Sequence, residues 1–429
     1  MVKWRLNMKI RSMELHNYRC FKDFNIAFDE RLTVLVGING AGKTATLDAL
    51  SVFLKWAGSP KTFNDQCRID NDDVTIGCEP ESIIYRLKLF PQYGFDEDLV
   101  NFDFKYDSSF VNSFKLSTPE AFHKIKSVIY DRKPLFVGYM AGRHISEEDT
   151  IMKKNTSNRT SYAAFDNNFK RNIDYASTLS WFNYADADEA RAMRDNGMLD
   201  ENPELVAVRA ALIKALHGKY DRPRMIGDPP ELIIYEKGID RYYKVNQLSD
   251  GYRVMLALVM DLARRMAQIE DDEPKTKELL LNKSAIVLID EVELHLHPAW
   301  QQTVLTTLMD IFPNTQFIVT THSPQVLTSI HNKHIRILSD GKAYTFNEQT
   351  EGAEASQLLK RVFRVEIRPK NLNIVKALKK YTKLVYDDKW DTKEATRLRK
   401  ILNSHYGYDD LELSKLDLHI ENKKWESGL

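Results

Sequence analysis

The order of hydrophobic and polar residues divides the chain into predicted strands and helices. Continuous apolar runs of strand length, typical of buried strands, occur at 31–37, 134–143, 284–291 and 315–323. Alternating apolar and polar residues predict two strands over 8–30, antiparallel strands within 74–115 and a hairpin over 231–245. The clearest helices are predicted over 43–56, over ELVAVRAALIKALHGK and after VNQLSDGYR. Strands that alternate with helices favour an α/β fold.

Changes in this pattern along the chain predict four segments. Residues 1–144 form an N-terminal lobe, 145–230 a polar and mostly helical inserted arm, 231–345 a C-terminal lobe, and 346–429 a charged helical extension. The 429 residues are enough for one large or two ordinary domains. No heptad repeat is sustained along the sequence, which excludes a long coiled coil.

Composition and charge exclude several classes of protein. The 61 Lys and Arg balance the 61 Asp and Glu, so a nucleic-acid-binding role would have to come from a local patch. The three cysteines, Cys20, Cys67 and Cys78, lack paired metal-binding spacing, and a reducing compartment is expected. No apolar run has the length of a signal peptide or a membrane span, so we expect a cytoplasmic protein with no membrane segment.

The sequence GINGAGKT at residues 37–44 fits the phosphate-loop pattern G-x-x-x-x-G-K-[ST] in full. A chance glycine turn would lack its context, a predicted strand before it and a predicted helix after it. Glycines let backbone N–H groups surround phosphates, and the helix start adds positive potential. Lys43 is expected to reach the outer phosphates of ATP, and Thr44 to hold Mg²⁺ through its hydroxyl.

Acidic residues and a histidine end two of the later apolar runs. Asp290 in AIVLIDE is predicted to hold Mg²⁺, directly or through water, and Glu291 to orient or deprotonate the attacking water. His322 ends IVTTH, where it can donate a hydrogen bond to the γ-phosphate. Such residues at strand ends are often incidental, but the phosphate loop in the same chain favours the catalytic interpretation.

A second turn that suits an anion, Ser249-Asp250-Gly251, opens the helix that follows it. It contains neither a lysine nor a metal ligand of its own. Ser249 and the N–H group of Gly251 are suited to the side of the γ-phosphate that a phosphate loop leaves open. Two chains arranged head to tail would complete each other's sites, so the sequence permits a homodimer or a higher oligomer of dimers.

In combination these motifs resemble those of ATP-binding-cassette (ABC-type) ATPases, in the variant found in soluble proteins of the structural-maintenance, Rad50 and RecF type. VNQLSDGYR resembles the signature motif, and NGAGKT, VLIDEVELHLHP, IVTTHSP and MELHNYRCFKDFNIAF match the same group. The resemblance covers about 8–60 and 240–330. It implies a Mg-dependent ATPase head with a P-loop core sheet, an antiparallel β subdomain and an inserted helical arm, followed by a C-terminal helical extension.

The resemblance also implies roles for single residues. Catalytic roles fall on Glu291, His322, Lys43 and Ser249. Nucleotide contacts fall on Asn39, Gly40, Ala41, Gly42, Lys43, Thr44, Ala45, Arg19, Ser249 and Gly251. Metal contacts fall on Thr44, Asp290 and Gln66, although the surroundings of Gln66, FNDQCRIDNDD, match the group poorly.

The sequence departs from the group at several points. The signature reads S-D-G-Y in place of the commoner S-G-G-Q, which puts the carboxyl group of Asp250 near the γ-phosphate. No acidic cluster of a topoisomerase-primase nuclease domain follows residue 340. The size and the tail resemble the ATPase subunit of Septu-type antiphage systems, including those attached to retrons. That narrower resemblance implies a separate HNH-type nuclease as partner, and also a retron reverse transcriptase with its RNA–DNA.

Two features and three functional interpretations stay open. Glu293, His295 and His297 could share a metal, or could form a loop at the dimer interface. Residues 360–383 hold nine Lys or Arg and one Glu, which suits nucleic acid, an acidic protein partner or solvent. The chain could be an ATPase that senses or controls a nuclease in antiphage defence, or a DNA-repair or DNA-end-binding ATPase. It could also be an assembly module that binds ATP but hardly hydrolyses it.

Overall fold

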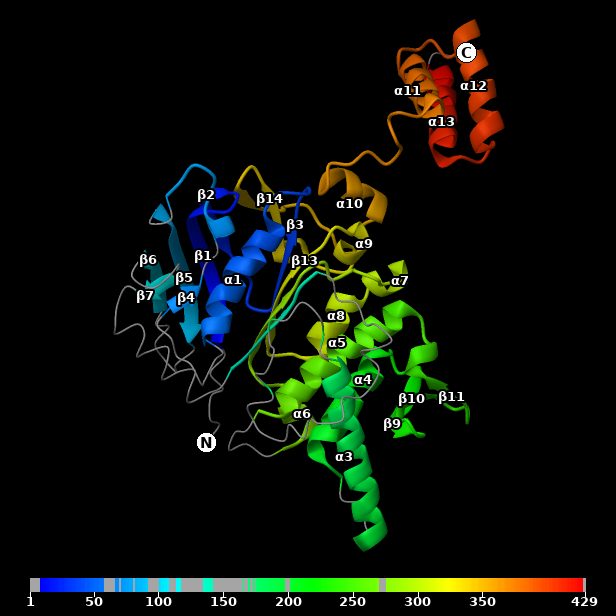
Figure 1. Ribbon diagram of the computed structural model, residues 1–429. Helices are drawn as coiled ribbons and strands as arrows, with labels where there is room; N and C mark the ends of the chain where they lie inside the picture. Colours follow the sequence, from blue (N-terminus) through cyan, green and yellow to red (C-terminus); the bar gives the residue numbers. More distant parts are fainter. Residues whose placement is uncertain are drawn as a thin grey trace. The chain divides into compact units, whose positions relative to one another are not determined.

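A computed structural model of the protein describes most of the chain. The described residues are 8–57, 66–68, 71–79, 82–91, 100–107, 113–116, 134–141, 164, 169, 173, 175–196, 201–269 and 275–426. The chain divides into two compact units, Met1–Leu358 and Leu359–Leu429 (Figure 1). Each unit has its own hydrophobic core.

The centre of the first unit is a six-stranded sheet with the order β15-β14-β3-β13-β12-β8. Its strands are β3 (Leu32–Val36), β8 (Leu135–Tyr139), β12 (Ala285–Ile289), β13 (Thr315–Thr320), β14 (Ile335–Ser339) and β15 (Lys342–Thr345). All pairs are parallel except β14 with the edge strand β15. β3, β8 and β12 are buried at every position, which is typical of parallel strands covered on both faces. The four predicted buried strands are confirmed.

A second six-stranded sheet, with the order β2-β1-β5-β6-β7-β4, is antiparallel throughout. Its strands are β1 (Met8–Tyr18), β2 (Phe21–Ala27), β4 (Gln66–Arg68), β5 (Ile84–Pro91), β6 (Val100–Asp107) and β7 (Ser113–Leu116). The predicted strands within 8–30 and 74–115 are therefore confirmed. The two sheets together give the predicted α/β fold class, with a mainly parallel P-loop core sheet and an antiparallel β subdomain.

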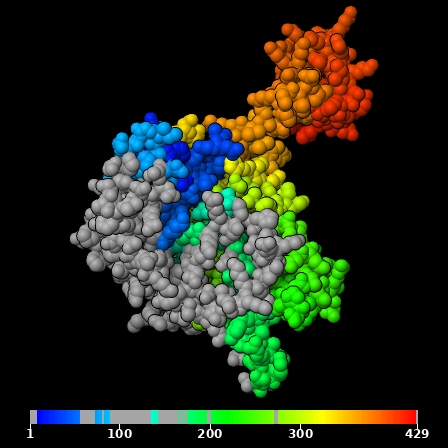
Figure 2. All heavy atoms as spheres, viewed as in Figure 1, coloured from blue at the N-terminus to red at the C-terminus, as the bar shows by residue number. Residues whose placement is uncertain are grey.

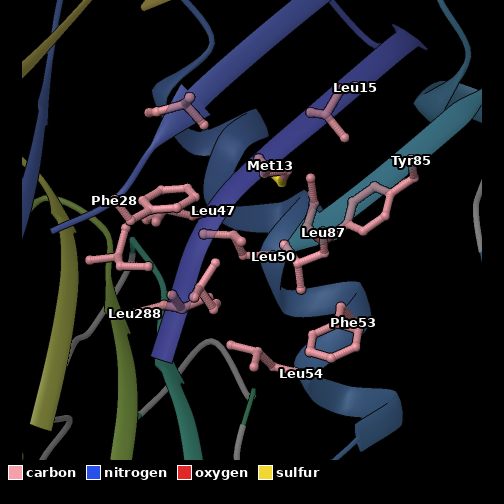
Figure 3. Close-up of a cluster of buried hydrophobic side chains, with 14 of the residues drawn as sticks. Met13, Leu15, Phe28, Leu47, Leu50, Phe53, Leu54, Tyr85, Leu87 and Leu288 are labelled. Atoms are coloured by element: carbon pink, nitrogen blue, oxygen red, sulfur yellow. The ribbon is translucent and has the colours of Figure 1, made fainter. Parts of the chain in front are cut away.

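Helix α1 (Lys43–Ala57) joins the two sheets through one hydrophobic core. Leu50 and Phe53 of α1 contact a cluster that includes Met13 of β1, Leu87 of β5 and Leu288 of β12 (Figure 3). All five side chains are fully buried. Burying a side chain of this size contributes about 1.5–3 kcal/mol, so this core fixes the helix that begins inside the phosphate loop.

Helix α5 (Asp250–Ala267) is buried along most of its length and contacts α3 (Tyr175–Asn196), α4 (Pro203–Ala215) and α6 (Lys277–Leu281). Helices α7 (Pro298–Gln301) and α8 (Val304–Ile311) lie between β12 and β13 in the chain, and α9 (Pro324–Leu327) follows β13. A three-stranded sheet lies beside α3 and α4, with β9 (Tyr220–Ile226), β10 (Glu231–Glu236) and β11 (Tyr242–Lys244) in the order β11-β10-β9. The predicted hairpin over 231–245 is confirmed as the β10–β11 pair.

Helix α4 shows where the predicted inserted arm meets the lobe. Asn202 caps its first turn by accepting the N–H of Glu204 at 3.0 Å, and Pro203 occupies the first helical position. The buried side of α4 contacts α5 and α6. This part of 145–230 therefore packs within the lobe, and the segment boundaries stay a prediction.

The second unit is helical. α10 (Ala355–Arg361) leads into it, followed by α11 (Asn373–Tyr386), α12 (Lys393–Tyr406) and α13 (Leu411–Glu426). Leu378, Leu402 and Leu416, one from each of the last three helices, belong to their common core. The space-filling view colours this unit orange to red (Figure 2). None of the helices among the described residues combines the length and apolar character needed to cross a membrane.

Candidate functional site

The predicted nucleotide-binding motifs follow strands that are neighbours in the central sheet. β13 lies between β3 and β12, and the three strands are parallel. The phosphate loop follows β3, Asp290 follows β12, and His322 lies two residues beyond β13. Because the carboxyl ends of parallel strands meet at one edge of a sheet, the fold brings these three motifs to the same edge.

Lys43 lies inside the phosphate loop, with only 6% of its surface exposed. Its Nζ donates hydrogen bonds to the carbonyl oxygens of Gly37 at 3.0 Å and Ile38 at 3.1 Å. Burial lowers the pKa of Lys43, while the carboxylates of Asp290, Glu291 and Glu293 act in the opposite direction. The loop carbonyls hold the ammonium group where phosphate oxygens can replace them.

The start of β2 covers the phosphate loop at Gly42. This glycine has a φ of 94°, in the region that side-chain-bearing residues rarely adopt. A Cβ atom at Gly42 would lie 2.2 Å from Cζ of Phe21 and 2.9 Å from Sγ of Cys20. The ring of Phe21 is itself held by stacking on Phe24, with ring centroids 4.0 Å apart. Only glycine fits at this position.

Thr44 of the phosphate loop and Asp290 of the acidic strand end, two of the predicted metal ligands, are in direct contact. Thr44 Oγ1 donates to Asp290 Oδ2 at 3.2 Å. The other carboxylate oxygen, Oδ1, accepts from Thr320 Oγ1 at 2.6 Å, and Asp290 is almost fully buried. Hydroxyl and carboxylate oxygens are ligands that Mg²⁺ prefers, so this pair fits the ion.

Glu291 occupies a strained backbone position beside this pair. Its φ of 49° lies in the left-handed region, which costs about 1–3 kcal/mol for such a residue and is concentrated at functional sites. Its backbone N–H donates to Thr320 Oγ1 at 2.7 Å, so Thr320 fixes both acidic residues at once. His322 is exposed, and its backbone N–H donates to Glu293 Oε1 at 2.5 Å.

The predicted nucleotide contact of Arg19 and the predicted metal contact of Gln66 stay predictions. Arg19, in the turn between β1 and β2, donates to Asp73 Oδ1 at 2.6 Å and is paired with Asp48 on α1. Burial lowers the pKa of Arg19, but Tyr18 and these two carboxylates outweigh that effect and raise it. Its approach to the nucleotide stays a prediction. Gln66 is the first residue of β4, and its side chain lies outside the described part of the structure.

The turn that opens α5 packs against the loop that follows the acidic residues. Ser249 is the exposed N-cap residue of α5, and its hydroxyl makes no capping hydrogen bond to this helix. Gly251 is buried, and a Cβ atom there would lie 3.0 Å from the carbonyl oxygen of His295. The ring of Tyr252, the next residue, contacts Trp300 of α7 edge to face, with centroids 4.7 Å apart. The signature turn and residues 295–300 therefore form one packed unit.

The acidic residue of the unusual signature has a partner on its own helix. The carboxylate of Asp250, which is 71% exposed, forms an ion pair with Arg253. This pair partly neutralises the carboxylate that the sequence puts near a γ-phosphate. His297, whose role in ELHLHP was open, caps α7 by accepting the N–H of Ala299 at Nδ1, 3.3 Å away. Among the described residues, no group of three or more potential ligands is arranged to hold a metal ion.

Sequence reasoning missed Thr320 and the contact of Glu293 with His322. Thr320 bonds to Asp290 and Glu291, and the Glu293 carboxylate accepts the backbone N–H of His322. Both lie within the quoted motifs, but a threonine at a strand end carries no signal of its own. Their roles depend on the pairing of β12 with β13, which only the fold reveals.

Curated proteins named as retron ATPases and as Septu PtuA are similar to this chain. "Retron Ec83 probable ATPase" of Escherichia coli is 38% identical over 46% of this chain and 35% of that protein. "Retron Vc95 probable ATPase" of Vibrio cholerae serotype O1 biovar El Tor is 25% identical over 94% of this chain and 88% of that protein. "Septu protein PtuA" of Bacillus mycoides (strain KBAB4) is 23% identical over 78% of this chain and 41% of that protein. The matches thus span less than half of the first and third proteins.

A solved structure and a family model also match this chain. The solved SMC head domain from Thermotoga maritima aligns with 80% of this chain and 99% of its own, at 15% identity and a TM-score of 0.44. The model of the family described as "AAA domain, putative AbiEii toxin, Type IV TA system" matches residues 32–328. That single match contains the phosphate loop, the signature turn, the acidic strand and His322, and it covers more than half of the chain. The chain therefore belongs to this family of AAA-domain ATPases.

Proposed function

We propose that the chain is a Mg-dependent ATPase that forms a homodimer and controls a partner nuclease in antiphage defence. The observation that carries the proposal is the contact of Thr44 Oγ1 with Asp290 Oδ2 at 3.2 Å, beside a buried Lys43. When bound there, Mg²⁺ would neutralise charge on the β- and γ-phosphate oxygens. Lys43 would turn its N–H groups from the loop carbonyls to the outer phosphates, and backbone N–H groups of residues 39–45 would surround them.

The hydrolytic step is assigned to the residues next to that pair. The carboxylate of Glu291 accepts a proton from the attacking water, and its backbone is fixed by Thr320 for that purpose. His322 donates a hydrogen bond to the γ-phosphate from the neighbouring strand end. Glu293 holds the backbone of His322 through the 2.5 Å hydrogen bond, so a movement of the acidic loop would also move His322.

Replacing the general base separates ATP binding from hydrolysis. Glu291→Gln keeps the shape of the side chain but removes the proton acceptor, and a general base contributes about 10²–10⁴-fold to a rate. We expect turnover to fall at least about 100-fold, with the affinity for a fluorescent ATP analogue unchanged. Glu278→Gln, on the exposed start of α6, is the control and should hydrolyse like wild type. Wild-type turnover in Glu291→Gln would show that this glutamate is not the base.

The dimer is proposed from the exposure and the hydrogen bonding of the signature turn, Ser249-Asp250-Gly251. Ser249 is exposed and does not cap its own helix, and among the described residues no hydrogen bond joins it to the phosphate loop. The N–H groups at the start of α5 and the Ser249 hydroxyl can bind an anion but have no lysine or metal ligand beside them. We therefore assign Ser249 and Gly251 to ATP held by the phosphate loop of a second chain, in a symmetric head-to-tail dimer.

Mixing two inactive variants tests this arrangement. Lys43→Ala removes the phosphate-loop charge, and Ser249→Arg blocks the signature turn. In a mixed dimer one site combines both intact elements, and the other site carries both defects. If the sites act independently, each mixed dimer should regain up to about half of the wild-type turnover.

The matched control for mixing uses two defects on the same side of the nucleotide. Lys43→Ala mixed with Glu291→Gln should regain nothing, because each site of the mixed dimer then contains one defective phosphate-loop side. Sedimentation with ATP and Mg²⁺ should show dimers in the wild type. A monomer that hydrolyses ATP at the full rate would contradict the proposed dimer.

The role in defence is proposed from the similarity to proteins named as retron ATPases and Septu PtuA. The resemblance to Septu-type subunits adds an HNH-type nuclease, and in retron-attached systems a reverse transcriptase with its RNA–DNA. We expect the tagged full chain, expressed with its neighbouring genes, to elute with an HNH protein. Its nuclease activity should then respond to ATP and be altered by Glu291→Gln. Neighbours that encode only replication or repair proteins would favour the alternative, a RecF- or Rad50-like ATPase that binds DNA ends.

One surface of the second unit favours that alternative. Residues 359–429 contain 17 Lys and Arg against 11 Asp and Glu, in a chain with no net charge. Lys376, Lys379, Lys380 and Lys383 are all exposed and recur at helical spacing along α11. Lys379 and Lys380 form surface ion pairs with Glu366 and Glu394, which contribute little to stability and can exchange for phosphates. We name these four residues the lysine face.

Nucleic acid binding by the lysine face is tested with the full chain. Lys376→Glu with Lys383→Glu should weaken binding to a fluorescent DNA duplex more than tenfold and reduce its salt dependence, because phosphate contacts release counterions. Lys342→Glu with Lys415→Glu changes the net charge equally at exposed positions outside α11 and should bind like wild type. Equal losses in both double variants would show that the face is not a specific site.

A further inference from the structure

A cluster of buried charges lies in the middle of α5, the helix that begins with the signature turn. Asp261 is 1% exposed, and its Oδ1 accepts from Arg264 at 2.9 Å and its Oδ2 from Arg265 Nε at 2.8 Å. Burial alone would raise the pKa of Asp261, but the two guanidinium groups outweigh it and lower the pKa to about 2. Asp261 is therefore an ionised carboxylate inside the core.

The same carboxylate accepts a hydrogen bond from the central sheet. Tyr139, the last residue of β8, donates its hydroxyl to Asp261 Oδ2 at 2.9 Å. The backbone carbonyl of Tyr139 accepts the N–H of Asp290 at 2.8 Å. One residue thus contacts both the helix that carries the signature turn and the acidic residue that contacts Thr44.

A further hydrogen bond to Asp261 comes from outside the sheet. Thr178 on α3 donates its hydroxyl to Asp261 Oδ1 at 3.2 Å. This bond resembles that of Tyr139 in its acceptor, its buried position and its donor type. It is longer, at 3.2 Å against 2.9 Å, it goes to the other oxygen of that carboxylate, and α3 does not lead to the acidic residues of β12. Thr178 therefore serves as an internal comparison for Tyr139.

Buried ion clusters are weak evidence for stability. Charges in the core lose their hydration, and a protein in which apolar residues of similar volume replace them is often equally stable or more stable. Buried polar groups can instead specify one arrangement of the elements they join. The cluster on α5 joins this helix to Tyr139 at the end of β8. Because the carbonyl oxygen of Tyr139 also accepts the N–H of Asp290, the way α5 and β8 are joined can affect the acidic end of β12.

We propose that Tyr139 is a positioning residue that couples α5 to the acidic end of β12, so that closure of the signature turn on a nucleotide is transmitted to Asp290 and Glu291. The proposal rests on the ATPase function and composite site proposed above. A shift of α5 along its axis moves the carboxylate of Asp261, and with it the hydroxyl of Tyr139. The backbone of Tyr139 then carries that shift to the N–H group of Asp290. Tyr139 acts only through these two contacts.

The test removes one hydroxyl at a time from the full chain. Tyr139→Phe keeps the ring and the backbone carbonyl but loses the bond to Asp261. Thr178→Val loses the equivalent bond from α3 and is the matched control. We expect Tyr139→Phe to lower kcat about tenfold with KM within about twofold of wild type, and Thr178→Val to leave kcat within about twofold. The thermal unfolding midpoints of the two variants should differ little, since each loses one hydrogen bond to the same group.

A second measurement does not depend on catalysis. Amide hydrogen exchange of residues 288–292 in the nucleotide-free protein reports the hydrogen bond from the Asp290 N–H to Tyr139. It should quicken in Tyr139→Phe and remain as in wild type in Thr178→Val. Equal exchange in wild type and Tyr139→Phe, or equal slowing of turnover by both variants, would overturn the coupling role. If wild type itself fails to hydrolyse ATP, the proposed function fails, whereas the exchange result still decides the coupling.

Discussion

The parallel pairing of β3, β13 and β12 is the constraint on which the rest of the site depends. It puts the phosphate loop, His322 and the acidic residues at one edge of the sheet, although they lie far apart in the sequence. The contact of Thr44 with Asp290 at 3.2 Å exists only because this register holds. A shift of one residue in the pairing of β3 or β12 with β13 would turn alternate side chains to the opposite face. It would also separate Thr44 Oγ1 from Asp290 Oδ2.

The packing around α1 makes that register rigid. The helix is held between the two sheets by Leu50, Phe53 and their neighbours, so Lys43 and Thr44 at its start have fixed positions. Burial lowers the pKa of Lys43, and the nearby carboxylates oppose that effect. The same carboxylates would repel the phosphates of ATP, and the Mg²⁺ proposed to be held by Thr44 and Asp290 would offset that repulsion.

Much of this arrangement could be predicted from the sequence. Continuous apolar runs predicted the buried strands, and the glycine and lysine spacing predicted the loop between β3 and α1. Several contacts between distant residues could not be predicted. Neither the two hydrogen bonds of Thr320 nor the ion pairs of Arg19 with Asp48 and Asp73 follow from local sequence, because each partner lies on another element. The helical pattern of α4 was recognised, but its packing on α5 depends on tertiary contacts.

Helix α5 has different surroundings along its length. Ser249 at its start is exposed and makes no capping hydrogen bond, while further along the helix an ionised carboxylate and two arginines lie in the core. Gly251 lets the start pack within 3.0 Å of the loop after the acidic residues, and Asp261 joins the middle to the strand beside them. The helix therefore contacts the acidic region at two points along its length. A rigid helix held at two points cannot tilt without disturbing at least one of those contacts, which is the geometric basis of the coupling proposed for Tyr139.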